Sequence, residues 1–260
     1  MHVSPDPDLV TYWLADAIDD RGYGIRGDSF AVVDALAAAG RPAWFRLGDR
    51  DLAMCLIRTE LLRSGRALTE AHAAVVEAMG VRTRVLPMCD EPVATWVRSE
   101  GDWVPFQEFM IVGAAAGPVE GVKLRGIERA RPSGAVLSAI AEAEAIVIGP
   151  SNPVISIGPI LAVPGMLEAI AEATAPVVAV SPFVGGRAVK GPTESFCAQA
   201  SIELSAAGIV DAYDGVLDGI VADEHVDGLP ALRVDTLMDT PEDRRRVAAS
   251  ALELARSLGR

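Results

Sequence analysis

Short runs of β-branched residues alternate with helical patterns through the middle of the chain. The runs at 145–150 and 175–182 are apolar and end on glycine or proline, as buried strands often do. Residues 133–144 and 165–174 carry apolar positions at three- and four-residue spacing, which is typical of helices that bury one face. Strands of this kind are buried on both sides of a parallel sheet. The pattern therefore predicts an α/β fold with a doubly wound, mainly parallel sheet.

The residues before this sheet predict a lobe of helices and antiparallel strands. Residues 51–63 and 69–79 form two helical patterns. Residues 81–87 alternate as in a strand, and residues 95–98 could pair with residues 103–111 in an antiparallel arrangement. The expected buried stripe of the first helix consists of Met54, Leu56, Ile57, Leu61 and Leu62.

The C-terminal part predicts two more strands and a long helix. We expect the strands at 219–222 and 231–234, and the helix at 241–258 with Thr240 as its N-cap. The chain has neither repeats nor a low-complexity linker. We therefore expect a single α/β domain over residues 1–260, with an insertion lobe at roughly 52–130.

Composition and charge narrow the class of protein. Half of the residues are apolar, which is enough for a large core and excludes disorder. Thirty-six acidic residues against 23 Lys and Arg give a net charge of −13, so a nucleic-acid backbone or an anionic membrane would be repelled. Three cysteines at wide spacings form no disulfide framework, and no apolar run is long enough to cross a membrane. These features predict a cytoplasmic protein without nucleic-acid or membrane partners.

The sharpest motif directly follows the first predicted strand. The sequence GPSNPVISIGPI at 149–160 would place Ser151, Asn152 and Ser156 in the crevice beyond the carboxyl ends of the strands, where α/β sheets bind ligands. Their hydroxyl and amide groups, with nearby backbone N–H groups, could bind an anion without adding charge. The alternative is an ordinary turn, because Ser, Asn, Pro and Gly are common turn residues.

A second motif, WFRLGDRDL at 44–52, sets four charged residues around one glycine at the start of a predicted helix. Asp49 or Asp51 could accept hydrogen bonds from ligand hydroxyl groups, and Arg50 could face an anion. In the alternative interpretation, Asp51 is only the N-cap of the helix and the charges pair with one another.

A third motif is the Pro-Asp-Pro-Asp sequence near the start of the chain. Its carboxylates, Asp6 and Asp8, could share a Mg²⁺ ion with substrate phosphates. Two acids beside a proline at a chain end also fit a solvated turn. By itself the spacing favours the turn.

A fourth motif, SPFVGGRAVKGP at 181–192, follows the second predicted strand. It offers Arg187 and Lys190 as local positive charge for an anionic substrate, or a plain surface hairpin at its Gly-Gly pair. The sequence has no HExxH, G-x-S-x-G or G-x-x-x-x-G-K-[ST] motif, which argues against a zinc peptidase, a hydrolytic triad and a P-loop NTPase.

Nine strings along nearly the whole chain carry a family resemblance. They occur in the order SPDPDLVTYWLAD, RGYGIRGDSF, WFRLGDRDLA, LIRTELLRSGRALTEA, VLPMCDEPVATWV, FQEF, GPSNPVISIGPILAVPG, SPFVGGRAVKGP and LMDTPEDR. Together they resemble the CofD/FbiA family, the 2-phospho-L-lactate transferases of coenzyme F420 biosynthesis. The resemblance implies a Rossmann-like α/β fold. It also implies attack by the ribityl hydroxyl of the deazaflavin Fo on the phosphate that joins lactate or enolpyruvate to GMP in a guanosine diphosphate adduct.

The resemblance also implies roles for the motifs. Asp6 and Asp8 would lie by Mg²⁺ and the diphosphate, Asp49 and Asp51 would face Fo or its hydroxyl, and Ser151 and Asn152 would line the nucleotide or Fo pocket. The implied partners are small molecules, Fo and the GDP adduct, and a homodimer is left open. The donor moiety, phospholactate or phosphoenolpyruvate, is open as well.

Two departures from the family pattern bear on activity. The family carries a glycine-rich strand-turn-helix before Pro-Asp-x-Asp, whereas Met1 of this chain falls just before that element, so we expect an N-terminal βα unit to be missing. After FQEF, where the family tends to have arginines, residues 110–117 read MIVGAAAG. A non-catalytic nucleotide- or flavin-binding remnant is therefore the alternative to an active transferase.

Overall fold

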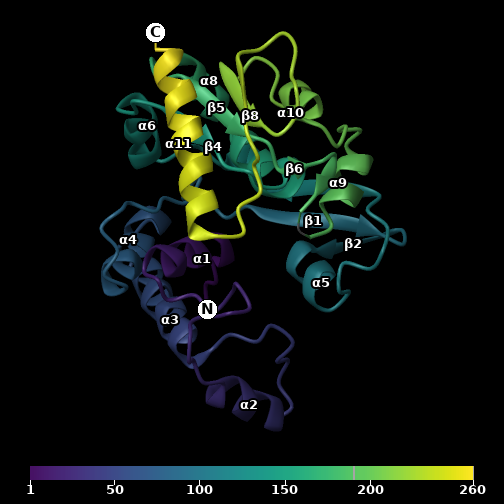
Figure 1. Ribbon diagram of the computed structural model, residues 1–260. Coiled ribbons are helices and arrows are strands. Elements are labelled where there is room, and N and C mark those ends of the chain that lie inside the picture. Colours follow the sequence, from purple (N-terminus) through teal and green to yellow (C-terminus); the bar gives the residue numbers. More distant parts are fainter. Residues whose placement is uncertain (190, 260) are drawn as a thin grey trace. The chain divides into compact units, whose positions relative to one another are not determined.

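The computed structural model describes residues 1–189 and 191–259, and it divides the chain into two compact units (Figure 1). The first unit is Met1–Pro92 and the second is Val93–Arg260. The boundary falls inside the expected lobe at 52–130. The single domain remains a prediction.

The first unit is built from helices. They are α1 (Pro5–Leu14), α2 (Ala31–Ala38), α3 (Asp49–Arg63) and α4 (Leu68–Ala78), of which α3 and α4 pack side by side. The predicted helices at 51–63 and 69–79 are confirmed to within two residues. The strand expected at 81–87 is wrong, because that segment has no strand partner and leads into a loop.

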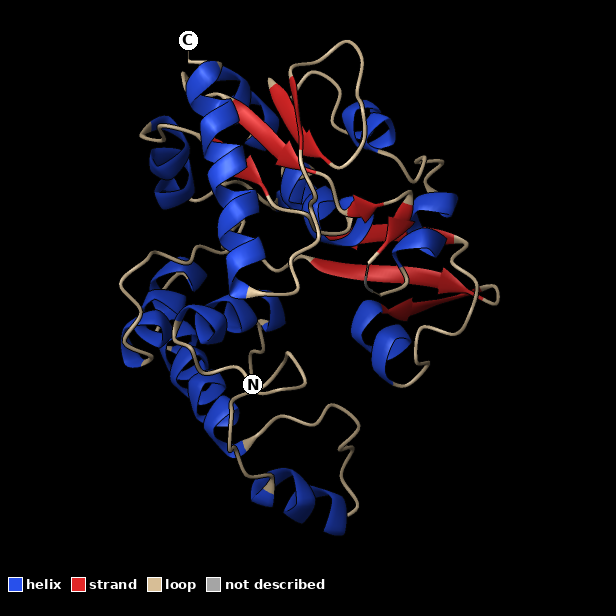
Figure 2. Ribbon diagram, in the orientation of Figure 1, coloured by secondary structure: helices blue, strands red, loops and turns tan. Residues whose placement is uncertain are grey.

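The second unit contains the predicted parallel sheet (Figure 2). Its strands are β4 (Ile146–Ile148), β5 (Val177–Val180), β8 (Gly219–Ala222) and β9 (Ala231–Arg233), hydrogen-bonded in the order β4-β5-β8-β9. All three pairings are parallel. Each of these strands was predicted from a short apolar run, and the predicted α/β class is confirmed.

Helices cover this sheet, and the longest of them packs closely against Gly219 of β8. Helix α11 (Pro241–Ser257) packs on β5, β8 and β9 (Figure 1). Val178, Val180 and Val221 of the sheet meet its apolar side. A Cβ atom at Gly219 would lie 2.8 Å from Leu258 Cδ1, so a larger residue there would force the Leu258 side chain to shift. Thr240 caps the helix as predicted, because its hydroxyl accepts a hydrogen bond from the Asp243 N–H. The remaining helices of this part of the unit are α6 (Gly134–Ala141), α8 (Met166–Glu172) and α10 (Ala206–Ala212).

An antiparallel sheet forms the other part of the second unit. It has the order β2-β1-β3, with β1 (Ala94–Ser99), β2 (Asp102–Pro105) and β3 (Gly121–Arg125). The expected pairing of 95–98 with 103–111 is confirmed only as far as Pro105, because Phe106–Ile111 is helix α5. Val97, Phe109 and Phe196 form the core under this sheet. The shorter elements of the unit are a 3₁₀ turn (Ile127–Arg129), a π-helical turn (Pro153–Ile157), α7 (Gly158–Leu161), β6 (Phe183–Val184), β7 (Arg187–Ala188) and α9 (Thr193–Gln199).

Among the described residues, no single helix is long and apolar enough to span a bilayer. Within residues 1–189 and 191–259, one bent pair, Pro153–Leu161 and Met166–Glu172 at 76° to each other, meets the length and composition of a span when taken together.

Candidate functional site

The carboxyl edge of the parallel sheet collects polar residues from three loops of the second unit. Asn152 follows β4, Ser181 follows β5 and Asp223 follows β8. Because the strands are parallel, their carboxyl ends lie at the same edge, which is where α/β sheets bind ligands.

Asn152 is the most constrained of these side chains. Its Oδ1 accepts hydrogen bonds from the N–H groups of Val154, at 2.8 Å, and Ile155, at 3.1 Å, and so caps the π-helical turn Pro153–Ile157. Two N–H donors identify the capping atom as the oxygen, which leaves the amide nitrogen Nδ2 on the other side. Asn152 is only 9% exposed, and Nδ2 has no hydrogen-bond partner among the described residues. A buried donor without a partner costs about 1–3 kcal/mol, and a ligand acceptor could remove that cost.

The rest of this loop is exposed at its tip and anchored at its base. Ser151 is exposed, and Ser156 is half-buried with its N–H donated to the Asn152 carbonyl. Val154 and Ile155 pack against the aromatic core around Phe196. The structure thus brings the three predicted loop residues together on a short, fixed segment, with Gly149 and Ser151 facing solvent.

The next loop forms a hairpin on the same edge. Strands β6 and β7 pair across Gly185 and Gly186, which both have positive φ, as a tight hairpin turn requires. The Gly185 N–H donates to Asp223 at 2.6 Å, so the hairpin is tied to the loop after β8. Arg187 is exposed on this hairpin, and Lys190 lies outside the described residues.

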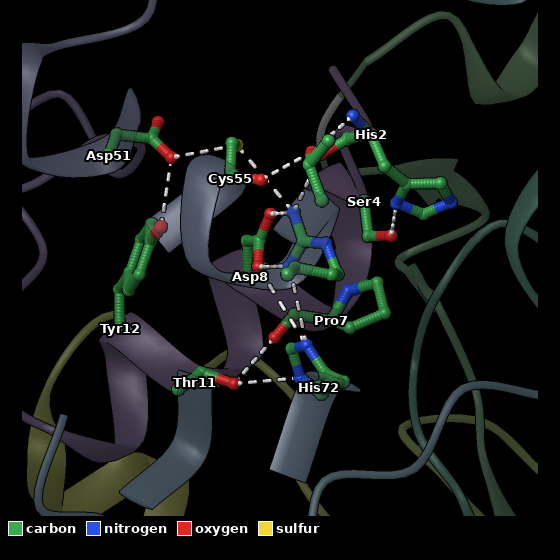
Figure 3. Close-up of polar contacts among 11 residues, drawn as sticks. His2, Ser4, Pro7, Asp8, Thr11, Tyr12, Asp51, Cys55 and His72 are labelled. Carbon is green, nitrogen blue, oxygen red and sulfur yellow. Dashed lines mark hydrogen bonds and ion pairs between the residues drawn. The ribbon is translucent and has the colours of Figure 1, made fainter. Parts of the chain in front are cut away.

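In the first unit, a buried polar cluster joins α1, α3 and α4 (Figure 3). Arg58 is fully buried and donates through Nη1 and Nη2 to both carboxylate oxygens of Asp8, at 2.6 and 2.7 Å. Bidentate pairs of this kind are the strong form of a charge-assisted hydrogen bond. Asp8 is therefore committed to Arg58, its partner 50 residues further along the chain.

His72 continues the cluster in a fixed tautomer. Its Nδ1 lies 3.4 Å from Arg58 Nη1, which can only donate, so Nδ1 accepts. Its Nε2 then carries the proton and donates to Thr11 Oγ1 at 3.2 Å, while the Thr11 hydroxyl donates to the Pro7 carbonyl at 2.7 Å (Figure 3). Burial lowers the pKa of His72, in keeping with a neutral imidazole beside a guanidinium.

Asp51 and Cys55 lie at the other end of the cluster. Asp51 accepts a hydrogen bond of 2.8 Å from the Tyr12 hydroxyl (Figure 3), and burial raises its pKa. Burial also raises the pKa of the Tyr12 hydroxyl, and it raises that of the Cys55 thiol to about 12. Cys55 is therefore a protonated, unreactive thiol at neutral pH.

Asp49 and its neighbours form reciprocal helix caps. The Asp49 carboxylate accepts from the Ser29 hydroxyl and from the N–H groups of Ala31 and Val32, at the start of α2. These hydrogen bonds, above all that from Ser29, lower the pKa of Asp49. In return, Asp28 accepts from the N–H groups at the start of α3, including that of Arg50 at 2.9 Å. Asp49 thus caps α2, and the cap of α3 comes from Asp28, not from Asp51.

Comparison with known proteins shows which family this chain belongs to. The family described as 2-phospho-L-lactate transferase CofD matches residues 1–248. The chain belongs to this family. A 2-phospho-L-lactate transferase of Methanosarcina mazei is 38% identical over 256 residues, which cover 95% of this chain and 84% of the relative. A phosphoenolpyruvate transferase of Streptomyces griseus subsp. griseus is 40% identical over 271 residues, covering 98% of this chain and 85% of the relative.

A solved structure supports the fold. Protein BH3568 from Bacillus halodurans, a member of the UPF0052 family, superposes with a TM-score of 0.53 over 75% of this chain and 70% of its own, at 19% identity. The predicted CofD resemblance and the transferase class are confirmed. The comparisons support a transferase of coenzyme F420 biosynthesis.

The CofD resemblance implies Mg²⁺, but the side chains of α1 do not fit a shared ion. Asp6 is exposed and Asp8 is buried, because residues two apart on a helix do not face each other. Asp8, Asp51 and Cys55 form another candidate metal site, because their possible ligand atoms lie within 4.8 Å of one another. Arg58 already neutralises Asp8, however, and a protonated thiol is a poor ligand for a hard cation. Desolvation and the nearby Asp8 charge raise the pKa of Asp6, and the role of both residues as metal ligands stays a prediction.

The sequence patterns did not reveal the buried face of α3. The expected buried stripe is wrong, because Leu56 is 59% exposed and its other four residues are only half-buried. The fully buried face instead carries Asp51, Cys55 and Arg58, with Thr59 beside them. The spacing 51, 55, 58 is itself a helical period, so a polar stripe at that period was the available signal for Arg58. His72 gave no sequence signal, because its neighbours on α4 are ordinary apolar residues.

His72 predicts a pH dependence of stability. The pKa of His72 is lower in the folded chain than its ordinary value of about 6.5, so below pH 6.5 the unfolded chain binds more protons. The free energy of unfolding should then fall as pH falls from 7 to 5, by up to about 1.4 kcal/mol per pH unit. Urea titrations at several pH values measure this slope.

A matched pair of variants tests whether the pH dependence of stability comes from His72. His72→Gln should flatten it, whereas His225→Gln, at an exposed position, should leave it unchanged. His2, whose pKa burial also lowers, adds a slope of the same sign, whereas Asp6 and Asp51, whose pKa values burial raises, add slopes of the opposite sign toward pH 5. An equal slope in His72→Gln and the unmodified chain would contradict the assignment.

Proposed function

We propose that the chain transfers a phospholactyl or phosphoenolpyruvyl group from a guanosine diphosphate adduct to the ribityl hydroxyl of the deazaflavin Fo. In this reaction the hydroxyl loses its proton to solvent and its oxygen forms a bond to phosphorus, while the bond from that phosphorus to the GMP phosphate oxygen breaks and GMP leaves. The proposed partners are these small molecules, and the proposed location is the cytoplasm. The family match supports the proposal, and Asn152 is the structural observation that carries it.

Asn152 suits the binding step of this reaction. Phosphoryl transfer depends on positioning and on stabilising charge more than on covalent catalysis. The unpartnered Asn152 Nδ2 can donate to a phosphate or carbonyl oxygen of a ligand that reaches it. In the proposal, Ser151 and Ser156 add hydroxyl groups, and Arg187 adds positive charge from the hairpin. With a net charge of −13, the protein would take the donor together with Mg²⁺ on its diphosphate, as part of the substrate.

A second candidate is a binding protein without catalysis. Asp49 is fully used as a helix cap, and Asp51 is buried against Tyr12, so neither is free to take a proton from a hydroxyl. These contacts favour binding of Fo or nucleotide without turnover. For Asp49, Arg50 and Asp51 to contact Fo, their present hydrogen bonds would have to break and be replaced by hydrogen bonds to Fo.

Turnover separates the two candidates. The purified chain should consume Fo and release an equal amount of GMP when given the GDP adduct of lactate or of enolpyruvate, and the preferred adduct identifies the donor. A chelator should abolish the reaction and Mg²⁺ should restore it, since Mg²⁺ neutralises the transferred phosphate. Binding of Fo or GDP without GMP release would establish the binding protein. Absence of both binding and turnover would contradict the proposed function.

A further inference from the structure

The outer face of the antiparallel sheet in the second unit carries two tryptophans and two basic side chains. Trp96 of β1 pairs with Lys123 of β3, and Arg125 lies two residues further along β3. Trp103 of β2 reaches the same face, because it pairs with Arg98, two residues from Trp96. Alternate residues of a strand point to opposite sides, so this face lies opposite the core residue Val97. We call Trp96, Trp103, Lys123 and Arg125 the tryptophan face.

The two cations are held against the indole rings. Lys123 Nζ lies 3.8 Å from the centroid of the Trp103 ring and 5.9 Å from that of Trp96. The Arg125 guanidinium carbon lies 3.4 Å from the Trp96 ring. Gly121 makes room for this stacking, because a Cβ atom there would lie only 3.3 Å from the Trp103 ring. The face is therefore preorganised by cation–π contacts.

Charge on the tryptophan face is not neutralised. Arg98, at its border, pairs with Glu120 at 3.5 Å. Across the part of the chain that the structure describes, neither Lys123 nor Arg125 has an acidic partner, although the chain has 36 acidic residues for 23 Lys and Arg. Desolvation and the nearby Arg125 charge lower the pKa of Lys123, the direction expected for adjacent cations without a counter-charge.

We propose that the tryptophan face is a docking surface for an acidic, carboxylate-rich segment of a partner protein. Carboxylates would complement Lys123 and Arg125, and the partly exposed indole of Trp103 adds apolar contact of the kind that dominates protein interfaces. A second copy of this chain fits less well, because a two-fold pairing of this face would set the cations of one copy against those of the other. The proposal is independent of the transferase activity.

Peptide titration tests the proposal. A synthetic octaglutamate peptide should bind the full chain at low salt, with octaglutamine as the neutral comparison, and added salt should weaken binding. The double variant Lys123→Gln/Arg125→Gln should bind octaglutamate roughly tenfold more weakly, the loss of two exposed ion pairs. The double variant Arg129→Gln/Arg244→Gln removes the same charge from other exposed positions and should bind as the unmodified chain does.

Several results would overturn the proposal. One is equal binding of octaglutamate and octaglutamine, or undetectable binding of octaglutamate. Equal weakening by both double variants would assign binding to net charge alone. Displacement of octaglutamate by an equal concentration of inorganic phosphate or GMP would make the face a small-anion site. A lower melting temperature of Lys123→Gln/Arg125→Gln with unchanged peptide affinity would leave the cation–π contacts a purely structural role.

Discussion

Asp8→Asn is expected to lower the free energy of unfolding by about 3–5 kcal/mol. The substitution keeps the shape of the side chain but removes the negative charge that neutralises Arg58. Arg58 is fully buried and Asp8 is 3% exposed, so water cannot take over from the lost carboxylate oxygen. An uncompensated charge in this position costs far more than the pair itself contributes. Urea denaturation followed by circular dichroism measures the change.

Two further variants make this result specific. Asp20→Asn removes the same charge from an exposed position of the first unit outside the cluster, and should change stability by no more than about 0.5 kcal/mol. The double variant Asp8→Leu/Arg58→Met replaces both charges by apolar groups and should recover most of the loss. If Asp8 were mainly a metal ligand, Asp8→Asn would leave stability nearly unchanged and raise the Mg²⁺ concentration that turnover requires.

The parallel sheet could be predicted because each strand carries its own signal. Runs such as Val177–Val180 are β-branched, apolar and bounded by proline, and nothing elsewhere in the chain is needed to recognise them. The signal for the long helix that begins at Pro241 is equally local, because Thr240 and Asp243 form its capping box. These elements are set by neighbours in the sequence, and the structure agrees with them.

The polar cluster of the first unit could not be predicted, because its partners are far apart in the sequence. Arg58 lies on a helix that reads as amphipathic with a leucine stripe, and a charged residue is normally placed toward solvent. Only the arrival of Asp8 and His72 from other helices makes its burial possible. The cap of α3 could not be predicted for the same reason. Asp28 accepts hydrogen bonds from N–H groups that lie more than 20 residues further along the chain.

The loop after β4 lies between these cases. Its position at the carboxyl edge of the sheet followed from strand order, and its serines and asparagine were recognisable as either a site or a turn. The structure gives Asn152 both properties, since one end of its amide caps a helical turn and the other end has no partner. Separating the two ends of this amide is therefore the decisive test of the loop.

Asn152→Asp is expected to weaken binding of GDP or Fo by about 1–3 kcal/mol, which is roughly five- to 150-fold in Kd. The aspartate keeps the oxygen that accepts from Val154 and Ile155, so the turn stays capped, but it replaces the Nδ2 donor by a second acceptor. A phosphate or carbonyl oxygen of the ligand would then face an oxygen in place of an N–H group. Calorimetric titration with GDP and with Fo measures the loss.

Asn152→Ser gives this test a neutral counterpart. Serine is also a good capping residue but is too short to reach a ligand held by the amide, so it too should weaken binding while the melting temperature changes little. Asn152→Ala removes the cap as well, and should lose both ligand affinity and about 1 kcal/mol of stability. If Asn152→Asp and Asn152→Ser both bind GDP and Fo as the unmodified chain does, while Asn152→Ala is only less stable, then the Asn152 amide serves the turn alone. The ligand must in that case be held by other residues at the sheet edge, with Arg187 the next to be substituted.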